Sequence, residues 1–380
     1  MKVERLLSVG DVREAARRRL PRAVFEFIDG GAEDEVTLRE NRQAFERRRV
    51  VRRVLTDVSS PELRIELLGT PCAAPLVVAP MGSCTLAWPE ADIAIARAAA
   101  RHGIPYVLST MSTTGMERLA NAVDGSMWFQ LYVLKEQAAN KTLIARAKSS
   151  GYTALVVTVD LQAGGKRERD LRNGISIPMR FGWRQLWDGL THPSWSFRAI
   201  TAGLPEFENV SGLLSDGRAG LTIAARVGKS LDAAFDWDGF VRLRDLWQGP
   251  MWVKGVEHPE DAARLVQLGA DGIWVSNHGG RQLDGAIASA DALPMISAAL
   301  GGKVPIIVDS GIRRGVDILK ARALGASAAA VGRPAIFGAA AAGERGAARV
   351  LEILIDELRL ASQLSGVPSL ATVDRSLLGP

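Results

Sequence analysis

The chain of 380 residues is long enough for one large domain or two ordinary ones, and its apolar fraction of 47% and charged fraction of 23% are typical of a globular protein. The net charge of +5 is compatible with an anionic ligand, but no nucleic-acid-binding motif is present, so we expect no nucleic-acid partner. The two cysteines, Cys72 and Cys84, have neither metal-ligand nor disulfide spacing, which predicts no metal site and suits a reducing compartment.

The N-terminal residues are charged throughout and lack the apolar centre of a signal peptide. The longest uncharged run, Thr70–Pro89, contains four prolines and cannot form a membrane helix; a barrel strand with flanking turns fits it better. We therefore expect a cytoplasmic protein.

Two helices are predicted ahead of the first apolar strand. The segment "LPRAVFEFIDGGA" (20–32) has a proline near its start and glycines at its end, as helices often do. The segment "DEVTLRENRQAF" (34–45) has the composition of a second helix. We expect them to form an N-terminal helical extension.

Eight short apolar runs follow, each preceded by a helical-looking segment. Runs that are apolar at nearly every position suit strands buried on both faces, as in a parallel sheet. Eight strand–helix units predict an α/β fold, and they favour a TIM (β/α)8 barrel rather than a doubly wound sheet. A dinucleotide-binding doubly wound sheet is further disfavoured because no G-x-G-x-x-G motif follows any run. The runs are Pro75–Gly82, Pro105–Thr110, Met127–Val133, Ala154–Asp160, Met251–Val256, Gly272–Asn277, Pro305–Gly311 and Ala328–Arg333.

The spacing of these runs has one outlier. Their starts are 30, 22, 27, 97, 21, 33 and 23 residues apart, so a long excursion over residues 161–250 follows the fourth strand. Connections of this length are usually binding loops or lids. We predict a single domain over residues 1–380 that includes this excursion.

Polar residues gather where the predicted strands end. In such barrels the active site lies at the carboxyl ends of the strands. Each residue taken singly is compatible with an ordinary capped or hydrogen-bonded rim position, but the whole set indicates a site. Its members are Ala79, Pro80, Met81, Gly82, Ser109, Thr110, Gln130, Tyr132, Thr158, Asp160, Lys254, Ser276, His278, Asp309, Gly311, Gly332 and Arg333.

The last two strands carry a predicted phosphate site. The segments "DSGIRRG" (309–315) and "VGR" (331–333) place glycines and arginines, including Arg313 and Arg333, where barrels commonly bind phosphate. Turn glycines with surface arginines are the simpler alternative.

Lys254, after the fifth strand, has three interpretations: a Schiff base, a fixed positive charge beside a cofactor that becomes anionic, or a structural ion pair.

The stretch "SNHGGRQLD" (276–284) contains a candidate base, His278. Asp160 is the candidate carboxylate that would fix its tautomer and stabilise the imidazolium. Arg281 and Arg167 offer two guanidinium groups for a substrate carboxylate, and the two glycines after His278 would let both side chains face inward. A core histidine with satisfied hydrogen bonds is the alternative.

These residues resemble the FMN-dependent 2-hydroxy acid oxidases and dehydrogenases, a family that includes glycolate oxidase, lactate oxidase, flavocytochrome b2 and mandelate dehydrogenase. The likeness covers nearly the whole chain, and "SNHGGRQLD" is its most specific signature. "LRDLW" and "HPSWSF" resemble the mandelate dehydrogenase branch in particular. The other matching segments are "FEFIDGGAEDEVTLRENRQAF", "GIPYVLST", "WFQLYV", "TVDLQAGGKRERD", "VKGV", "DSGIRRGVDILKARALGA" and "VGRPAIFG".

The resemblance implies a role for each candidate. His278 would be the base, with Asp160 behind it, and Lys254 would stabilise negative charge on the flavin. Arg281, Arg167 and Tyr132 would hold the substrate carboxylate. The flavin ring would be lined by Ala79, Pro80, Met81, Gly82, Ser109, Gln130, Thr158 and Ser276, and the ribityl phosphate would be bound by Asp309, Gly311, Arg313, Gly332 and Arg333.

The chain departs from the family pattern at two positions. Phe27 stands where the family usually has a tyrosine whose hydroxyl helps to bind the carboxylate, and Met81 stands where a threonine is usual. The first departure bears on substrate affinity or identity, and the second on flavin packing. Gly82, where many oxidases have alanine, resembles mandelate dehydrogenase and favours an electron acceptor other than oxygen.

The resulting prediction is FMN-dependent oxidation of a mandelate-like or other bulky (S)-2-hydroxy acid, with a quinone or similar electron acceptor and a homotetrameric assembly. The alternatives are an oxidase that reduces oxygen to hydrogen peroxide, a Schiff-base lyase using Lys254, and a non-catalytic barrel that binds a phosphorylated ligand. Within "RFGWRQLWDGLTHPSWSF" (180–197), three tryptophans are interleaved with arginine, which is typical of an interfacial membrane contact. We expect residues 180–217 to contact the inner face of the cell membrane; packing of the tryptophans onto the barrel or a neighbouring subunit is the alternative.

Overall fold

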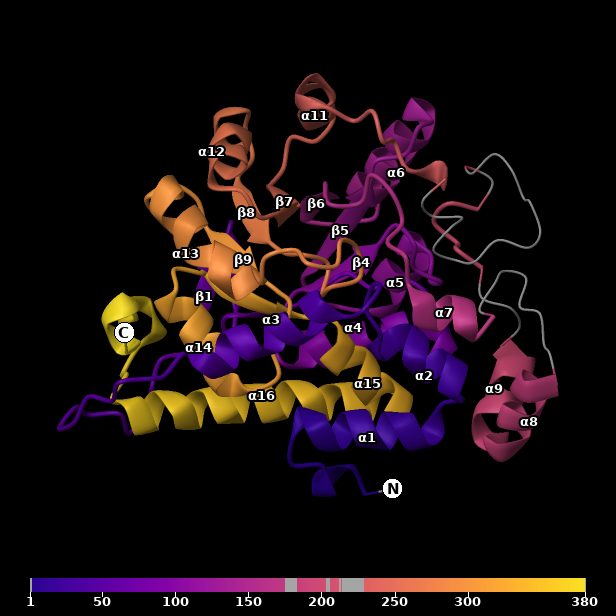
Figure 1. Ribbon diagram of the computed structural model, residues 1–380. Helices are drawn as coiled ribbons and strands as arrows, with labels where there is room; N and C mark the ends of the chain where they lie inside the picture. Colours follow the sequence, from indigo (N-terminus) through magenta and orange to yellow (C-terminus); the bar gives the residue numbers. More distant parts are fainter. Residues whose placement is uncertain (1, 175–182, 203–205, 212, 214–228, 380) are drawn as a thin grey trace.

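A closed barrel of eight parallel strands forms the centre of the molecule (Figure 1). The computed structural model describes residues 2–174, 183–202, 206–211, 213 and 229–379. The strands close in the order β10-β3-β4-β5-β6-β7-β8-β9, which confirms the predicted barrel. Each of the eight apolar runs contains one strand: β3 Leu76–Val78, β4 Tyr106–Ser109, β5 Met127–Tyr132, β6 Ala154–Thr158, β7 Met251–Val256, β8 Gly272–Val275, β9 Ile306–Val308 and β10 Ala328–Val331.

Helices surround the barrel and connect successive strands. The long α16 lies beside four other helices, as Figure 1 shows along the lower side of the barrel: α1 (Val9–Arg19), α4, α14 and α15, whose bounds are given with those of α16 below. Short 3-10 helices, η1 to η4, occupy Val3–Arg5, Cys84–Leu86, Leu370–Thr372 and Arg375–Leu377. The helices that follow β3 to β5 and β7 to β10 are α4 Ala91–Arg101, α5 Met116–Ala122, α6 Gln137–Ser149, α12 Pro259–Gln267, α13 Ser289–Leu300, α14 Gly315–Ala323, α15 Arg333–Ala342 and α16 Glu344–Ser365.

The N-terminal extension contains both predicted helices, α2 (Arg22–Asp29) and α3 (Val36–Arg47). It also contains α1 (Val9–Arg19), which the sequence analysis missed. This helix buries only Val9, Val12 and Ala16 among many charged residues, so its apolar pattern is weak. The main apolar cluster runs from Val3 to Leu378, so extension and barrel share one core. We therefore propose that residues 1–380 form a single domain.

A small hairpin, also unpredicted, precedes the barrel. Strands β1 (Ile65–Leu67) and β2 (Thr70–Cys72) pair antiparallel across Leu68 and Gly69, which both have positive φ. The start of the uncharged run at Thr70 therefore belongs to this hairpin, and the barrel strand begins only at Leu76. Leu67 and Cys72 pack into the apolar cluster inside the barrel and so cover one end of it.

The barrel interior changes from apolar to polar along each strand. Trp128, Trp252 and Trp274 are fully buried in the interior cluster, and Trp128 stacks on Trp252 with ring centroids 5.7 Å apart. Because side chains alternate between the two faces of a strand, the next interior position lies two residues further on. The interior pairs, apolar residue first, include Val107 and Ser109, Trp128 and Gln130, Val156 and Thr158, Trp252 and Lys254, Trp274 and Ser276, and Ile307 and Asp309.

The excursion after β6 forms helices beside the barrel. They are α7 (Glu168–Arg172), α8 (Trp183–Thr191), α9 (Pro193–Ala202) and α11 (Trp237–Arg244). Figure 1 shows α8 and α9 together at the edge of the molecule. Parts of the predicted contact segment, residues 180–182, 203–205, 212 and 214–217, lie outside the described residues.

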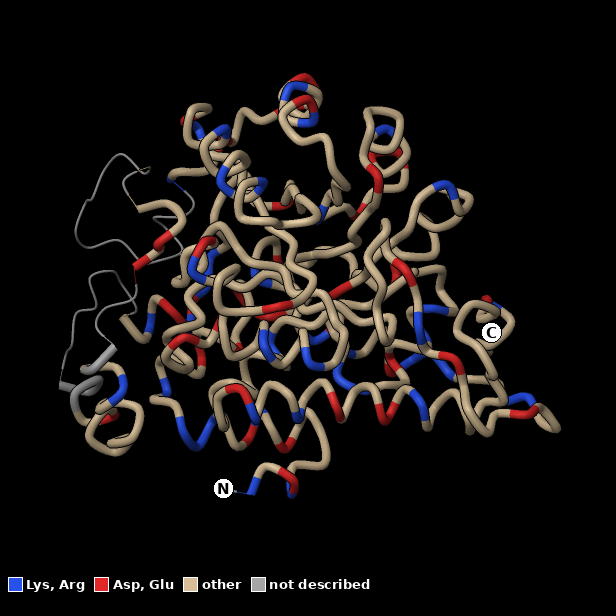
Figure 2. Tube along the Cα trace, turned by 180° about the vertical axis from the view of Figure 1, so that it is seen from behind, with Lys and Arg blue, Asp and Glu red and all other residues tan. Residues whose placement is uncertain are grey.

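Charged side chains of both signs share the surface. Figure 2 shows Lys and Arg interspersed with Asp and Glu along the outer helices. Many form surface ion pairs, such as Arg118 with Glu90 at 2.9 Å and with Glu208 at 2.6 Å. Pairs of this exposed kind contribute little to stability, about 0–1 kcal/mol each.

Candidate active site

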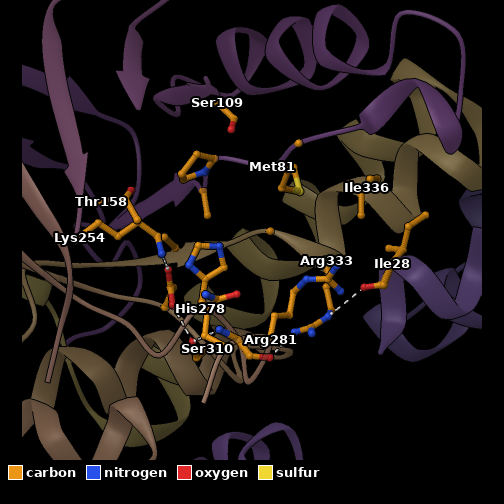
Figure 3. A pocket seen from close by; sticks show the side chains of 18 of the residues that line it. Ile28, Met81, Ser109, Thr158, Lys254, His278, Arg281, Ser310, Arg333 and Ile336 are labelled. Atoms are coloured by element: carbon orange, nitrogen blue, oxygen red, sulfur yellow. Dashed lines mark hydrogen bonds and ion pairs between the residues drawn. The ribbon is translucent and has the colours of Figure 1, made fainter. Parts of the chain in front are cut away.

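One cavity at the carboxyl ends of the strands collects most of the predicted site residues. Figure 3 shows His278 in its middle, with Lys254 and Thr158 on one side and Arg333 and Ile28 on the other. Asp160, Gln130 and Ser276 lie behind this lining and contact it through hydrogen bonds. The predicted residues that line the cavity are Phe27, Ala79, Pro80, Met81, Gly82, Ser109, Tyr132, Thr158, Arg167, Lys254, His278, Arg281, Asp309, Gly311, Arg313, Gly332 and Arg333.

His278 lies between a carboxylate and a phenol. Its Nδ1 is 3.1 and 3.2 Å from the two carboxylate oxygens of Asp160, and its Nε2 is 3.2 Å from the hydroxyl of Tyr132. Burial opposes ionisation of Asp160, but attraction to His278 and Lys254 keeps the pKa of this carboxyl below its ordinary value. An ionised Asp160 only accepts hydrogen bonds, so Nδ1 carries a proton, and in the neutral imidazole Nε2 has the lone pair that can take a proton from a ligand.

The backbone after β8 aims this histidine. His278, Gly279 and Gly280 all have left-handed φ values, of 58°, 68° and 71°. A Cβ on Gly279 would lie 2.7 Å from Arg333, and one on Gly280 would lie 2.6 Å from the backbone of Leu38. The two glycines therefore permit a tight turn against the N-terminal extension. A non-glycine residue such as His278 costs free energy to hold in the left-handed region, and residues held in this way are often found at functional sites.

Lys254 belongs to a buried polar network. Its Nζ donates to Ser276 Oγ at 2.8 Å and lies 3.4 Å from Asp309 Oδ2. The hydroxyl of Ser276 in turn donates to Asp309 Oδ1 at 2.7 Å and accepts from the backbone N–H of His278 at 3.0 Å. The network therefore ties the lysine to the loop that carries His278.

A second polar chain runs along the cavity wall from Ser109 to Thr158, which is the register partner of Lys254. Ser109 donates to the amide oxygen of Gln130, and the amide nitrogen of Gln130 donates to Thr158, each at 3.0 Å. Gln130 and Ser109 are about 1% exposed, so this chain is fixed by the barrel rather than by solvent.

Two guanidinium groups face the ring of Phe27. The carbon at the centre of the guanidinium lies 5.9 Å from the ring centroid for Arg167 and 5.2 Å for Arg281. Burial lowers the pKa of Arg167, and burial together with repulsion from Arg167 and Arg333 lowers that of Arg281 well below its ordinary value. Arg167 Nε is a buried donor that makes no hydrogen bond in the described part of the chain, and its ion pair with Asp170 is long, at 3.5 Å. This pair is therefore poised for an anion.

The two predicted phosphate arginines differ. Arg333 donates to the carbonyls of Ile28, Gly279 and Gly30 at 2.8–3.1 Å and so fastens α2 to the barrel. Arg313 donates from Nη1 to the carbonyl of Ile312 at 2.8 Å, and burial with repulsion from Arg333 and Arg42 lowers its pKa to about 9. Arg313 is therefore the freer of the two for an external phosphate.

The charges that line the cavity fit an anionic cofactor and an anionic substrate. Among the described lining residues, five carry cationic side chains and one, Asp309, carries a carboxylate. Buried charges of one sign need compensation, because desolvation in the protein interior is costly. The phosphate of FMN and the carboxylate of a hydroxy acid would supply the compensating negative charge. The residues that line the cavity therefore fit a bound FMN.

Several lining residues escaped the sequence analysis. Most are apolar or close to a predicted residue, and only Ser310, next to Asp309 in "DSG", carried a usable signal. Ser310 donates to Asp309 at 2.7 Å and accepts from Gly279 N–H at 3.0 Å. The missed residues include Ile28, Ser83, Met111, Leu161, Gly164, Gly279, Gln282, Ser310, Ile312 and Ile336.

A second cavity, of about 460 Å³, lies behind the His278–Asp160 pair. It is lined by Asp160 and by Glu257, which directly follows β7. Burial and repulsion from Asp160 and Asp309 raise the pKa of Glu257 to about 7, and its Oε1 is a buried atom without a hydrogen-bond partner in the described chain. Nothing in its local sequence distinguished this glutamate from a surface residue.

Comparison with known proteins agrees with this arrangement. A family model described as FMN-dependent dehydrogenase matches residues 16–380. The sequence is 41% identical to (S)-mandelate dehydrogenase of Pseudomonas putida over 376 residues, which cover 99% of this chain and 94% of that protein. It is 40% identical to an L-lactate dehydrogenase of Pseudomonas aeruginosa over 369 residues, or 97% of each. A solved structure described as monotopic membrane protein (S)-mandelate dehydrogenase matches with a TM-score of 0.93 and 40% identity over 99% of both chains.

Proposed function

Since the chain belongs to the FMN-dependent dehydrogenase family, we propose that it oxidises a bulky, mandelate-like (S)-2-hydroxy acid to the 2-oxo acid and passes the electrons to a quinone or another acceptor than oxygen. The enzyme is an FMN-dependent oxidoreductase, and its relatives include dehydrogenases of mandelate and of lactate. The observation that carries the proposal is the excess of cationic side chains around the His278–Asp160 pair.

The proton chemistry is assigned to His278. Oxidation of a hydroxy acid removes two electrons and two protons, and bound FMN supplies the two-electron acceptor. Nε2 of His278 takes one of the two protons, and the other would go with the two electrons to the bound FMN, in either order of transfer. Asp160 holds Nδ1–H and stabilises the imidazolium that results, as a carboxylate behind a general base does.

The substrate carboxylate is assigned to Arg281, Arg167 and Tyr132. Carbonyls of Phe27 and Gly30 accept from Nη1 of Arg281 at 2.7 and 3.0 Å, which fixes the direction of its guanidinium. Arg167 contributes its Nε–H, which makes no hydrogen bond in the described chain and only a 3.5 Å ion pair with Asp170. Two preoriented guanidinium groups can bind a carboxylate with charge-assisted hydrogen bonds and place the α-carbon beside His278.

The FMN is assigned to the rest of the lining. Backbone from Ala79 to Gly82, with Met81, would line its ring system, supported by the Ser109–Gln130–Thr158 chain. Lys254, backed by Ser276, would stabilise negative charge on the reduced ring. Asp309, Gly311, Arg313, Gly332 and Arg333 would hold the ribityl phosphate, near the N-terminus of α15, where helix N–H groups favour an anion.

Phe27 supports a bulky substrate. It is 8% exposed, lines the cavity and contributes an apolar ring where a hydroxyl would bind a small anion better. A phenyl side chain on the substrate can pack against such a ring and offset the missing hydrogen bond.

The electron acceptor distinguishes the two candidate functions: a dehydrogenase passes electrons to a quinone or similar molecule, and an oxidase, the second candidate, passes them to oxygen. Gly82 lies against Met111, and an added Cβ would come within 3.0 Å of the Met111 carbonyl. We propose that glycine at position 82 favours an electron acceptor other than oxygen. The lyase and the non-catalytic barrel are set aside by the family, and the ammonium of Lys254 is already engaged by Ser276 and Asp309.

The test uses protein purified without added cofactor. We expect it to be yellow, to release FMN on denaturation, and to be bleached without oxygen by (S)-mandelate faster than by (R)-mandelate, L-lactate or glycolate. Reoxidation by a quinone analogue should then outpace reoxidation by air. Faster bleaching by lactate or glycolate contradicts the bulky substrate, and rapid peroxide formation in air contradicts the non-oxygen acceptor.

We also propose that α8 and α9 contact a membrane surface. The large apolar side chains of Trp187 and Leu190 on α8, and of Phe197 and Ile200 on α9, are 66–81% exposed. Each pair is spaced by three residues and so shares one face of its helix. Among the described residues, no helix is both long and apolar enough to cross a membrane. An interfacial contact needs only such a face.

Vesicle flotation tests the membrane contact. The chain should float with vesicles that contain anionic lipid, and the double variant Phe197→Ser, Ile200→Ser should float much less while keeping its FMN and its activity. Leu364→Ser, a similarly exposed apolar residue on α16, serves as the control. Equal flotation of the double variant and the wild type contradicts the assignment.

A further inference from the structure

Trp274 contacts the Lys254–Asp309 pair from inside the barrel, without lining the cavity. Its indole Nε1 donates to Asp309 Oδ2 at 3.0 Å, and Lys254 Nζ lies 6.0 Å from the centroid of its ring. Trp274 and Lys254 are also partners in the register of β8 and β7. The side chain is completely buried, so the contact is fixed by packing on all sides.

The indole N–H of Trp274 distinguishes it from two tryptophans in the same layer. Trp128 and Trp252 are equally buried, yet their Nε1 atoms have no hydrogen-bond partner in the described chain. All three fill the barrel with large rings, and only Trp274 meets the carboxylate beside Lys254. Filling volume therefore does not require this hydrogen bond, because the two neighbouring indoles do without one.

Asp309 is shared between four groups. Ser276 and Ser310 donate to Oδ1, each at 2.7 Å, while Trp274 and Lys254 approach Oδ2 at 3.0 and 3.4 Å. On Oδ2 the indole therefore competes with the ammonium. Loss of the indole N–H leaves Lys254 as the partner of that oxygen, which draws its charge toward Asp309 and away from the cavity.

We propose that Trp274 is a positioning residue, which holds Asp309 through its indole N–H so that the charge of Lys254 acts on the FMN bound in the cavity. The inference rests on the proposed function for the place of the flavin beside Lys254. A positive charge near a flavin stabilises its reduced, anionic form more than its oxidised form. Trp274 therefore makes the bound FMN easier to reduce, although it does not touch it.

The experiment removes the N–H in two ways, once together with part of the ring and once with the bicyclic ring kept. Trp274→Phe is one variant; the second carries 3-benzothienylalanine at position 274, in which sulfur replaces the N–H in a ring of nearly the same shape. Trp252→Phe is the matched control, because it removes an indole N–H that has no partner. FMN content and melting temperature check that each protein is folded and loaded.

The measurement is the two-electron midpoint potential of the bound FMN, taken by equilibration with redox dyes. We expect both changes at position 274 to shift the reduction equilibrium about tenfold toward oxidised FMN, which corresponds to about 30 mV more negative. Trp252→Phe should change it by less than about twofold. Potentials at wild-type level in the benzothienyl variant, or an equal shift in Trp252→Phe, overturn the proposal.

The same proteins separate this inference from the proposed function. The dye titration uses a chemical reductant, so it reports on Trp274 whether or not a hydroxy acid reduces the enzyme. A wild-type protein that retains FMN but is bleached by no 2-hydroxy acid contradicts the proposed function alone. A wild type that is bleached by (S)-mandelate, with unchanged potentials in both variants at position 274, contradicts the role of Trp274 alone.

Discussion

The two ends of the cavity differ in how their positively charged side chains are balanced by carboxylates. At the Lys254 end the ammonium is matched by the carboxylate of Asp309 and by hydrogen bonds to Ser276. At the Phe27 end, Arg167 and Arg281 lie over an aromatic ring, and their nearest carboxylate, Asp170, is 3.5 Å from Arg167 Nε. The first end matches one ammonium with one carboxylate, whereas the second has two guanidinium groups beside one carboxylate and so leaves a positive charge for an anion from outside.

The largest effect is expected where the two ends meet, at His278. Replacing it by Gln keeps polarity but removes the proton acceptor, so reduction of the FMN by substrate should slow by roughly 10²-fold or more, the usual scale for a general base. Stopped-flow absorbance of the flavin without oxygen measures this rate. Retention of FMN at wild-type level is the control for folding, and a near-normal rate would mean that His278 is structural.

A large effect is also expected at the arginine end. Arg281→Lys keeps the charge but loses the planar fork, so binding of a substrate carboxylate should weaken. Hydrogen bonds to charged groups contribute about 1.5–3 kcal/mol, which predicts a Michaelis constant for (S)-mandelate raised roughly 10- to 150-fold. Arg172→Lys, on an exposed side chain of α7, is the matched control. An unchanged Michaelis constant would remove Arg281 from the substrate site.

A smaller and selective effect is expected at Phe27. Phe27→Tyr adds a hydroxyl near the two guanidinium groups and restores the donor that the family usually has. The Michaelis constant for L-lactate and glycolate should fall by several-fold, within the range of one hydrogen bond, and that for (S)-mandelate should change less. Steady-state kinetics with all three acids decide the matter. If neither constant changes, residue 27 does not face the substrate.

The smallest effect is expected on thermal stability, at Glu257 in the second cavity behind the His278–Asp160 pair. Its pKa of about 7 lies above the ordinary 4.5, so between these values the folded state binds more protons than the unfolded state. The free energy of unfolding therefore falls as the pH rises through this window. Glu257→Gln removes that loss, so its melting temperature should exceed that of the wild type at about pH 8 and approach it at about pH 5. Glu260→Gln, exposed on α12, is the control, and a pH-independent difference contradicts the assignment.

Much of the site could be predicted because it follows the strands. His278 and Asp309 follow the apolar strands β8 and β9, Lys254 lies two residues before the end of β7, and a parallel barrel brings all such ends to one rim. Glu257 and Trp274 could not be predicted in the same way. Glu257 looks like a surface residue next to a helix start, and Trp274 like any apolar strand residue; their importance depends on Asp160 and Asp309, which come from other strands.

The sequence by itself determined the eight strands, two of the N-terminal helices and the long excursion, because apolar runs and helix-ending glycines are local signals. Tertiary structure alone decided which groups meet. His278 is 118 positions from Asp160, and Arg281 is 254 positions from the Phe27 carbonyl that it holds. It also decided that Arg333 fastens α2 while Arg313 stays freer, and that one buried indole of three has a carboxylate to bind. Such contacts depend on barrel closure and on the direction of each side chain, and no pattern along a single segment encodes either of these.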